Sequence, residues 1–276
     1  MEMVAAAKMR RAQQQALAMR PYATKARDVL VHLASQRGAN EELHPLLRRR
    51  ATVERVAIIL FTSNKGLCGG YNHNILRLAD QFSEDATVPI SWITVGRKGR
   101  NATARSGRPI IADFEEITDQ PGLLEITAIA RLVIQDFLAG QFDEVQLMYT
   151  DFINTMVQKP HVRPLLPLQY GAMDNKLPGA QAEATPALIE YVYEPSPSEL
   201  LDTVVPRLVE LQIYEALLEA KASEHSARMV AMRAATDNAE DLVSALTLTY
   251  NQVRQSAITK EMLDIVGGTE ALAQRR

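Results

Sequence analysis

Apolar residues recur with a heptad period at the amino-terminal end of the chain. Positions separated alternately by four and three residues are mostly apolar over more than four heptads, which predicts a long helix that buries one stripe of side chains. Pro21 lies inside this pattern and is expected to kink or divide the helix, and Gly38 follows it as a candidate C-cap. The stripe consists of Met1, Ala5, Lys8, Ala12, Gln15, Met19, Tyr22, Ala26, Val29 and Leu33.

The carboxyl-terminal third repeats the same period over a greater length. Ser196-Pro197-Ser198-Glu199 has the pattern of a capping box with proline at the first helical position, and Gly267-Gly268 is expected to end the helix. Pro206 is expected to kink or restart it. The stripe consists of Leu218, Ala222, His225, Met229, Met232, Thr236, Ala239, Val243, Leu246, Tyr250, Val253 and Ala257.

Two stripes of this kind predict a left-handed coiled coil of the two terminal helices, antiparallel because the middle of the chain returns it. A continuous helix from Pro206 to Val266 would be about 90 Å long, which exceeds the diameter of a compact domain of this size. We therefore expect the carboxyl-terminal helix to extend beyond the domain. The apolar stripe at its far end should pack against something other than the shorter amino-terminal helix.

The middle of the chain alternates between strand and helix patterns. The apolar run Val56–Phe61 is typical of a strand buried on both faces, and the alternation predicts a mainly parallel sheet covered by helices. The fold class is therefore α/β: a long antiparallel coiled coil with an inserted Rossmann-like domain. The expected domains are residues 1–50, 53–195 and 196–276. The other expected elements are strands Ile90–Val95, Glu144–Phe152 and Ala187–Tyr193, helices Tyr71–Phe82 and Leu123–Leu138, and a loop over Gly171–Pro186.

Composition narrows the function classes. The 276 residues contain 47% apolar residues and one cysteine, so a disulfide framework, a four-cysteine zinc site and a CxxC redox pair are excluded. A net charge of −3 gives no support for nucleic-acid binding, and no apolar run is long enough to span a membrane. The first 50 residues are nevertheless basic, with ten Lys or Arg against four acids. A targeting peptide is one interpretation, and a basic helix face that meets an acidic partner is the better one.

The segment Thr62–Gly70 follows the first predicted strand and precedes a helix, where Rossmann-like folds place phosphate loops. It matches neither GxGxxG nor the P-loop pattern, because Lys65 precedes the glycines. Cys68 could act as a nucleophile with His73 as its base, although a buried packing thiol is the simpler interpretation.

The remaining chemistry-bearing residues form no recognisable site. The five histidines lack metal-ligand spacing, and no triad, carboxylate dyad or cofactor fingerprint is present. We expect a non-catalytic protein without cofactor or metal. A nucleotide-binding enzyme that uses Lys65–Gly70, and a coiled-coil scaffold that dimerises, are the alternatives.

Several motifs resemble the gamma subunit of F-type ATP synthase, of the bacterial type. They occur in the family's order along the whole chain, and the run Ile258-Thr259-x-Glu261-x-x-Asp264 resembles its carboxyl-terminal signature. The other matching runs are Met1–Met9, Arg20-Pro21-Tyr22, Gly66–Asn72, Ala222–His225, Ala227–Met232 and Ala235–Ala239.

The resemblance implies a non-catalytic rotor shaft that couples proton flow through the membrane ring to ATP synthesis at the alpha-beta hexamer. The implied partners are the alpha, beta, epsilon and delta subunits and the c-ring, with no nucleic acid and no homo-oligomer. The paired-cysteine insertion of the chloroplast form is absent. The implied location is therefore peripheral, on the cytoplasmic side of a bacterial plasma membrane.

Site residues follow from the same resemblance. It implies contact with the hexamer at Met1, Arg254, Gln255, Thr259 and Glu261. It implies a position towards epsilon and the c-ring for Gly66, Gly69, Tyr71, Glu210, Gln212 and Tyr214.

Two positions and the amino-terminal end depart from the family pattern. Asn64 stands where the family usually has Asp, and Gly268 where it usually has Ala. Family members also carry about twenty helical residues, or about 30 Å of helix, before the run that starts at Met1. The resemblance therefore implies a misassigned start codon or a truncated chain.

Overall fold

The computed structural model describes residues 1–35, 44–50, 52–115, 117–118, 121–168 and 197–273. These residues fall into two units, residues 1–230 and residues 231–276. The division into residues 1–50, 53–195 and 196–276 stays a prediction. Gly38, the loop over 171–186 and the strand over 187–193 lie outside the described residues.

A five-stranded sheet forms the centre of the first unit, in the order β3-β2-β1-β4-β5. The first four strands of that order run parallel to their neighbours, and β5 runs antiparallel to β4. The mainly parallel α/β sheet predicted from the alternating pattern is therefore confirmed. The strands are β1 (Val56–Phe61), β2 (Ile90–Val95), β3 (Ile110–Phe114), β4 (Glu144–Phe152) and β5 (Gln158–Leu166).

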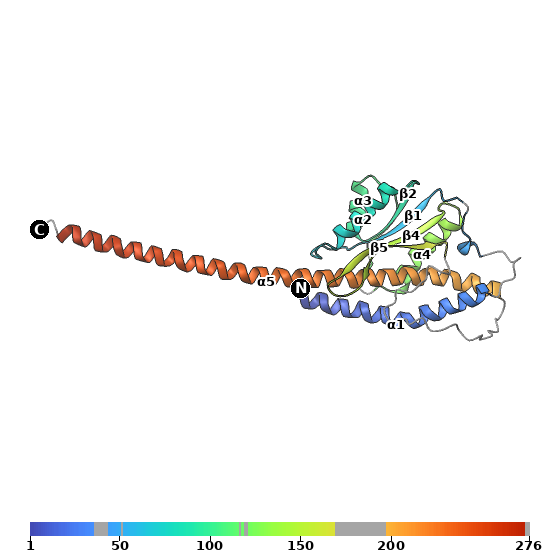
Figure 1. The fold of residues 1–276 in the computed structure, drawn as a ribbon, viewed down its shortest axis with the longest axis horizontal. Coiled ribbons are helices and arrows are strands. Elements are labelled where there is room, and N and C mark those ends of the chain that lie inside the picture. The colour runs from blue at the N-terminus through green and yellow to red at the C-terminus, as the bar shows by residue number, and fades with distance from the viewer. Residues whose placement is uncertain (36–43, 51, 116, 119–120, 169–196, 274–276) are drawn as a thin grey trace. The chain divides into compact units, whose positions relative to one another are not determined.

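Helices cover both faces of the sheet (Figure 1). Alternate residues of β1 point to opposite faces, as the strand period requires. Ile58 and Leu60 pack with Ile75 and Ala79 of α2. The alternate residues Ala57, Ile59 and Phe61 pack in the larger cluster that includes α4 and α5. This two-sided burial explains why β1 is apolar throughout. The covering helices are α2 (Tyr71–Asp85), α3 (Arg97–Arg105) and α4 (Leu123–Leu138), and a short 3-10 helix η1 spans Pro45–Leu47.

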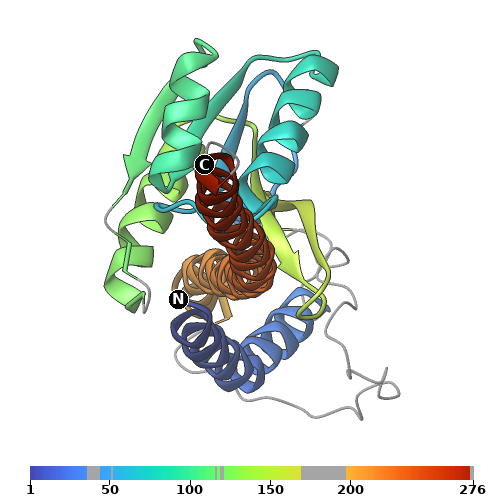
Figure 2. The same cartoon turned by 90° about the vertical axis from the view of Figure 1, so that its left-hand side faces the viewer.

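Two long helices come from the ends of the chain, α1 (Glu2–Ser35) and α5 (Pro197–Ala273). Within the first unit, α1 lies antiparallel beside α5, on the side of α5 that faces away from the sheet (Figures 1 and 2). Both helices continue through their internal prolines, Pro21 and Pro206, without a break. The predicted antiparallel pairing is therefore confirmed within this unit. Of the predicted effects of the prolines, the division or restart of either helix is wrong, and a kink stays a prediction.

The buried stripe of α1 is shifted from the predicted one. Ala5, Met9 and Ala12 are buried, so Met9 takes the position that the pattern assigned to Lys8. Tyr22 is 58% exposed, although the pattern placed it in the stripe. The heptad spacing was therefore right, but the assignment of Lys8 and Tyr22 to the buried stripe was wrong. Small and polar residues at neighbouring positions leave the limits of the stripe poorly defined in the sequence.

The second unit consists of the part of α5 beyond Val230. Its apolar stripe residues are exposed: Val243, Leu246, Tyr250 and Val253 each expose more than half of their surface. The helix also continues through Gly267-Gly268 to Ala273, so the prediction that these glycines end it is wrong.

Four elements of the described residues were absent from the sequence-based prediction: η1, β3, α3 and β5. In β3 apolar and polar residues alternate imperfectly over five positions, and α3 is nine residues long with four basic side chains. In β5, Pro160 and Pro164 interrupt the apolar pattern, which is compatible with a strand only because β5 lies at the edge of the sheet.

Candidate functional site

The carboxyl ends of the parallel strands meet at one edge of the sheet, where Thr62–Gly70 leaves β1. The chain proceeds from β1 to β2 on one side, while β4 lies on the other side of β1. Open α/β sheets usually bind ligands at such a point, because the connections separate there and leave a crevice. In this protein α5 packs against that edge, through the residues from Leu217 to Arg228.

Hydrogen bonds from three different segments join the sheet edge to α5. The Tyr71 hydroxyl donates to the carbonyl oxygen of Ala220 at 3.2 Å. The Ser223 hydroxyl donates to the carbonyl oxygen of Thr150 in β4 at 3.0 Å. The Ser226 hydroxyl donates to the carbonyl oxygen of Thr155 at 2.8 Å, in the turn between β4 and β5. Side-chain hydroxyls of α5 thus satisfy backbone acceptors that lie at the end of the sheet.

Arg228 holds the glycine-rich loop against the helix. Its guanidinium donates to the carbonyl oxygens of Lys65 and Gly66, at 3.3 and 3.4 Å, and to the Glu224 carboxylate at 2.8 Å. Within the loop, Leu67 adopts a left-handed conformation with φ of 61° and exposes 67% of its surface. A left-handed conformation is unfavourable for a residue with a side chain. The surrounding contacts must therefore stabilise it at Leu67.

Backbone donors at the start of α3, beside the loop, are already engaged. At the start of α3, the N–H groups of Arg97, Lys98 and Gly99 donate to the Asn64 side chain, the Ser63 carbonyl and the Thr62 hydroxyl, respectively. The Ser63 N–H donates to the side chain of Asn72. These amides would otherwise form an anion site at a helix N-terminus. Arg97, Lys98 and Gly99 therefore offer no free backbone amide to a phosphate.

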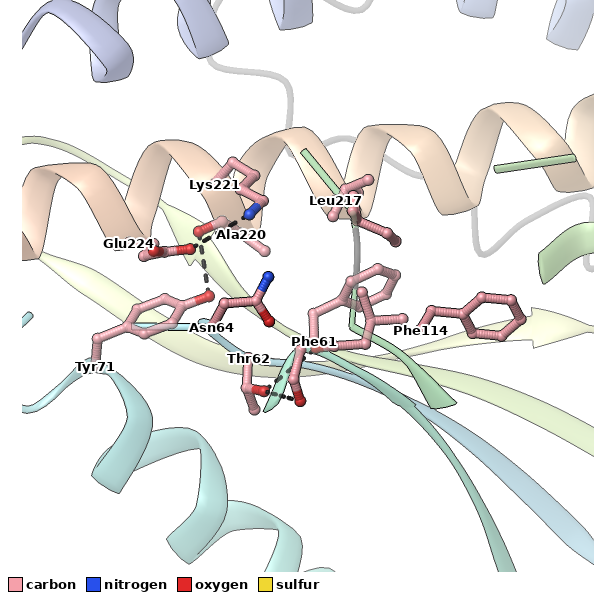
Figure 3. A pocket seen from close by; sticks show the side chains of 12 residues that line it. Phe61, Thr62, Asn64, Tyr71, Phe114, Leu217, Ala220, Lys221 and Glu224 are labelled. Atoms are coloured by element: carbon pink, nitrogen blue, oxygen red, sulfur yellow. Dashed lines mark hydrogen bonds and ion pairs between the residues drawn. The ribbon is translucent and has the colours of Figure 1, made fainter. Parts of the chain in front are cut away.

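A small cavity remains between the sheet edge and α5 (Figure 3). Its volume is about 10 Å³, which is room for about one water molecule and none for a nucleotide. Lys221 and Glu224, a buried ion pair at 3.7 Å, line it together with Tyr71. Burial, and secondly the Glu224 carboxylate, raise the pKa of Tyr71 well above its usual value, so its hydroxyl stays a hydrogen-bond donor.

Cys68 is buried beside this edge. Its Sγ accepts a hydrogen bond from the Asn72 amide at 3.1 Å and lies 3.9 Å from the Ser63 hydroxyl. His73, the candidate base, is exposed on α2. Since neither Asn72 nor Ser63 is a base, these contacts favour a packing role for the thiol.

Two searches of the described residues gave negative results. They contain no group of three or more His, Cys, Asp or Glu side chains placed to hold a metal ion. They also contain no helix with the length and apolarity needed to cross a membrane.

The family resemblance implied two groups of site residues, and the structure brings only some of them close to one another. Gly66 and Gly69 lie exposed in the loop that α5 contacts, and Tyr71 is buried against α5. Earlier on α5, Glu210 and Gln212 are buried, and the Tyr214 hydroxyl donates to the carbonyl oxygen of Pro121. The proposed hexamer contacts are exposed, in the first unit for Met1 and in the second for Arg254, Gln255, Thr259 and Glu261. Direct contact of these residues with partners stays a prediction.

Sequence reasoning missed the residues that bind the helix to the sheet. Ser223, Glu224 and Arg228 were noted only as parts of motifs, and Ser226 was not noted. The only signal in the sequence was the run of four consecutive polar residues, Ser223 to Ser226, and the structure shows that all four are buried. Buried polar residues need partners, so such a run indicates a specific contact.

In this protein the chain's own long helix, α5, packs against the sheet edge at which open α/β sheets usually bind ligands. The fold therefore defines a class of protein in which the α/β domain anchors a long helix. Comparisons with known proteins identify this class further. Residues 1–272 match the family model described as ATP synthase. The ATP synthase gamma chain of Dehalococcoides mccartyi is 45% identical over 273 residues, covering 99% of this chain and 92% of that protein. The gamma chain of Roseiflexus castenholzii is 43% identical with the same coverage. The chain therefore belongs to the ATP synthase gamma chain family.

Solved structures of low sequence identity share the fold. The central stalk of the Tetrahymena thermophila mitochondrial ATP synthase matches with a TM-score of 0.62 at 21% identity, covering 85% of this chain and 97% of that one. A chain of the Euglena gracilis mitochondrial enzyme matches with a TM-score of 0.59 at 20% identity, covering 98% and 94%. At this level of identity the likeness shows that the chain shares the fold of these ATP synthase chains.

Proposed function

We propose that this chain turns inside a hexamer of alternating alpha and beta subunits and couples proton flow through a membrane ring to ATP synthesis there. In this proposal the chain carries no catalytic residue, and its asymmetric surface drives each catalytic site through different affinities in turn. The observation that carries the proposal is the exposed apolar stripe of the second unit. Val243, Leu246, Tyr250 and Val253 repeat at heptad spacing and are exposed. Apolar surface of this kind marks a protein interaction site.

The polar residues that would meet the hexamer lie on the same stretch of helix. Arg254, Gln255, Thr259 and Glu261 are exposed there and can form directional contacts with a surrounding ring. We place Met1 in the same group on the basis of its 80% exposure and of the family resemblance.

The α/β domain would carry the contacts with the membrane ring and the epsilon subunit. Gly66 and Gly69 supply exposed backbone at the sheet edge. Tyr71, Glu210, Gln212 and Tyr214 would act mainly by fixing the domain to α5, since they are buried or partly buried. Transmission of torque requires such a rigid attachment, and the hydrogen bonds from Tyr71, Ser223 and Ser226 supply it.

The remaining partners follow from the same assignment. We infer assembly with alpha, beta, epsilon and delta subunits and the c-ring, and neither a homo-oligomer nor a nucleic-acid complex. The location would be peripheral, on the cytoplasmic side of a bacterial plasma membrane.

Co-purification tests the proposal. The tagged chain is expressed with its native partners, membranes are extracted mildly, and the recovered proteins are identified while ATPase activity is measured. We expect alpha, beta and epsilon subunits in the eluate, with ATPase activity carried only by the assembly. Recovery of the chain alone with bound nucleotide, or as a stable homodimer, would contradict the proposal.

A matched pair of variants makes the test specific for the apolar stripe. Leu246→Glu combined with Val253→Glu places two charges on the stripe, and we expect recovery of the alpha and beta subunits to fall at least tenfold. Ser244→Glu places one charge on another face of the same helix and should leave recovery unchanged. Equal recovery with the stripe variant and the control would remove the stripe from the interface.

A further inference from the structure

The cavity between α5 and the ends of the parallel strands has the size and the lining of a water site. Its volume of about 10 Å³ matches the space that one water molecule needs. Lys221 and Glu224 line it from α5 (Figure 3). Tyr71 lines it from the start of α2, and Asn64 from the loop after β1. The proposed function uses no ligand at this position.

The Lys221 ammonium and the Glu224 carboxylate are too far apart for a direct hydrogen bond. Nζ lies 3.7 Å from Oε2, whereas a charge-assisted bond of this kind is about 2.7–2.9 Å long. Both residues are buried, with exposed fractions of 6% and 4%, so they are largely removed from bulk water. Arg228 donates at 2.8 Å to the other carboxylate oxygen, Oε1. Oε2 and the ammonium therefore face each other across a gap that a bridging water would fill.

A molecule that both accepts and donates hydrogen bonds satisfies the two charged groups at once. An ammonium has three donors and no acceptor, and a carboxylate has acceptors only. Water accepts from Lys221 and donates to Glu224 in one position. An anion there would face the Glu224 carboxylate, and a cation would face the Lys221 ammonium, so either ion would meet a like charge.

Asn64 and Tyr71 supply further hydrogen-bonding groups. The Asn64 Oδ1 accepts from the Arg97 N–H at 2.9 Å, and its Nδ2 donates to the carbonyl oxygen of Glu115 at 2.7 Å. These two bonds fix the amide with its nitrogen toward α5, and Nδ2 carries a second N–H (Figure 3). The Tyr71 hydroxyl donates to the carbonyl oxygen of Ala220, so its oxygen serves the cavity as an acceptor. The site thus offers two donors and two acceptors, which is within the range that a buried water uses.

We propose that one water molecule occupies this cavity and bridges the Lys221 ammonium to Oε2 of Glu224. Asn64 and Tyr71 are its further partners. The bridge completes the solvation of a buried ion pair and keeps the carboxylate in the orientation that Arg228 uses. Since Arg228 also holds the glycine-rich loop, the water is part of the joint between that loop and α5. The proposal concerns the chain itself and does not depend on the proposed function.

A crystal structure of the full chain, at a resolution that shows ordered water, tests the proposal. We expect one peak of density within about 3.2 Å of both Lys221 Nζ and Glu224 Oε2. Absence of this peak, or a direct bond in which Nζ and Oε2 approach to about 3 Å, would overturn the proposal. Crystals grown with bromide as the halide identify a bound anion by its anomalous signal. A bromide peak at this position would also overturn the proposal.

A matched pair of variants tests which group binds the water. Lys221→Met keeps a long unbranched side chain and removes the ammonium, so we expect the peak to be lost. Lys260→Met removes an exposed ammonium in the second unit and should keep the peak. Trp92, the single tryptophan, is buried in the sheet, and its fluorescence verifies that both variants are folded. A peak that persists at the same position in Lys221→Met would contradict the proposed bridge.

Discussion

The Tyr71 hydroxyl donates a hydrogen bond of 3.2 Å to the carbonyl oxygen of Ala220, across 149 positions of sequence. Tyr71 is the first residue of α2, directly after the glycine-rich loop, and Ala220 lies on α5. The bond therefore fixes the edge of the sheet to the helix at the point where related folds open a ligand crevice. Because the bond is buried, its loss removes a donor from the Ala220 carbonyl oxygen inside the protein.

Tyr71→Phe removes this hydrogen bond and keeps the ring. We expect the free energy of unfolding to fall by about 1 kcal/mol, the ordinary net contribution of one intramolecular hydrogen bond. Urea denaturation followed by Trp92 fluorescence measures the change. Tyr22→Phe alters an exposed tyrosine on α1 and serves as the matched control, with no expected effect. Equal stability of the two variants would show that the Tyr71 bond contributes nothing.

A second prediction concerns the close approach of Gly96 to Thr62. Gly96 adopts φ of +103°, and a Cβ added there would collide with the Thr62 carbonyl oxygen, which is backbone and cannot move aside. We expect Gly96→Ala to destabilise the chain by about 3 kcal/mol, since it combines backbone strain with overpacking. Gly66→Ala is the control, because an added Cβ there meets nothing within 4 Å. Thermal unfolding of the two variants should differ clearly, and similar melting temperatures would refute the assigned role of Gly96.

Asp143 gives a prediction about acid stability. Its burial disfavours the charged form, but N–H donors from Glu54 and Arg55 and the Arg50 guanidinium outweigh this, so the pKa of Asp143 is lowered. A lowered pKa in the folded state stabilises the chain above the ordinary aspartate value, and this contribution is lost as the pH falls through the folded value.

We therefore expect Asp143→Asn to lose about 2 kcal/mol of stability at pH 7, because three donors lose a charged acceptor. The difference from the parent should shrink steadily below pH 4. Urea denaturation at a series of pH values measures it, and Asp237→Asn, at an exposed position, is the control. A difference that is constant from pH 7 to pH 3 would contradict the assignment.

The sequence predicted the central elements well because their patterns are strong. The bounds of β1, β2, β4 and α4 agree with the observed elements, since long apolar runs and a clear helical period define them. The elements that were missed have weak local patterns. Four basic residues mask the period of α3, and prolines mask β5. Their structure is decided by tertiary contacts, such as the pairing of β5 with β4.

The candidate site was less predictable than the fold. The sequence predicted the loop after β1 from its glycines and its place in the chain. It did not predict that α5 packs against this loop. The bonds of Ser223 to Thr150 and of Arg228 to Gly66 join residues 73 and 162 positions apart. No local periodicity encodes such pairs. The burial of the polar run Ser223 to Ser226, which reveals the contact, became visible only in the structure.

Glu224 provides the strongest contrast with Glu219, five residues earlier on the same helix. Glu224 is 4% exposed, and it accepts from Arg228 at 2.8 Å and pairs with Lys221 at 3.7 Å. Two cations surround this one carboxylate, whereas burial, followed by the nearby Glu215 and Asp151 carboxylates, raises the pKa of Glu219 to about 7. Removing the charge of Glu224 leaves buried cations poorly compensated, which is strongly unfavourable.

We therefore expect Glu224→Gln to lower the free energy of unfolding by about 3 kcal/mol at pH 8, where Glu219→Gln should raise it. Glu240→Gln, at an exposed position of the same helix, should change it by less than about 0.5 kcal/mol. Urea denaturation followed by Trp92 fluorescence compares the three variants under one condition. If Glu224→Gln and Glu219→Gln shift stability in the same direction, the charge environments assigned to these two carboxylates are wrong. Opposite shifts would show that the same substitution has different effects because the surrounding charges have opposite signs.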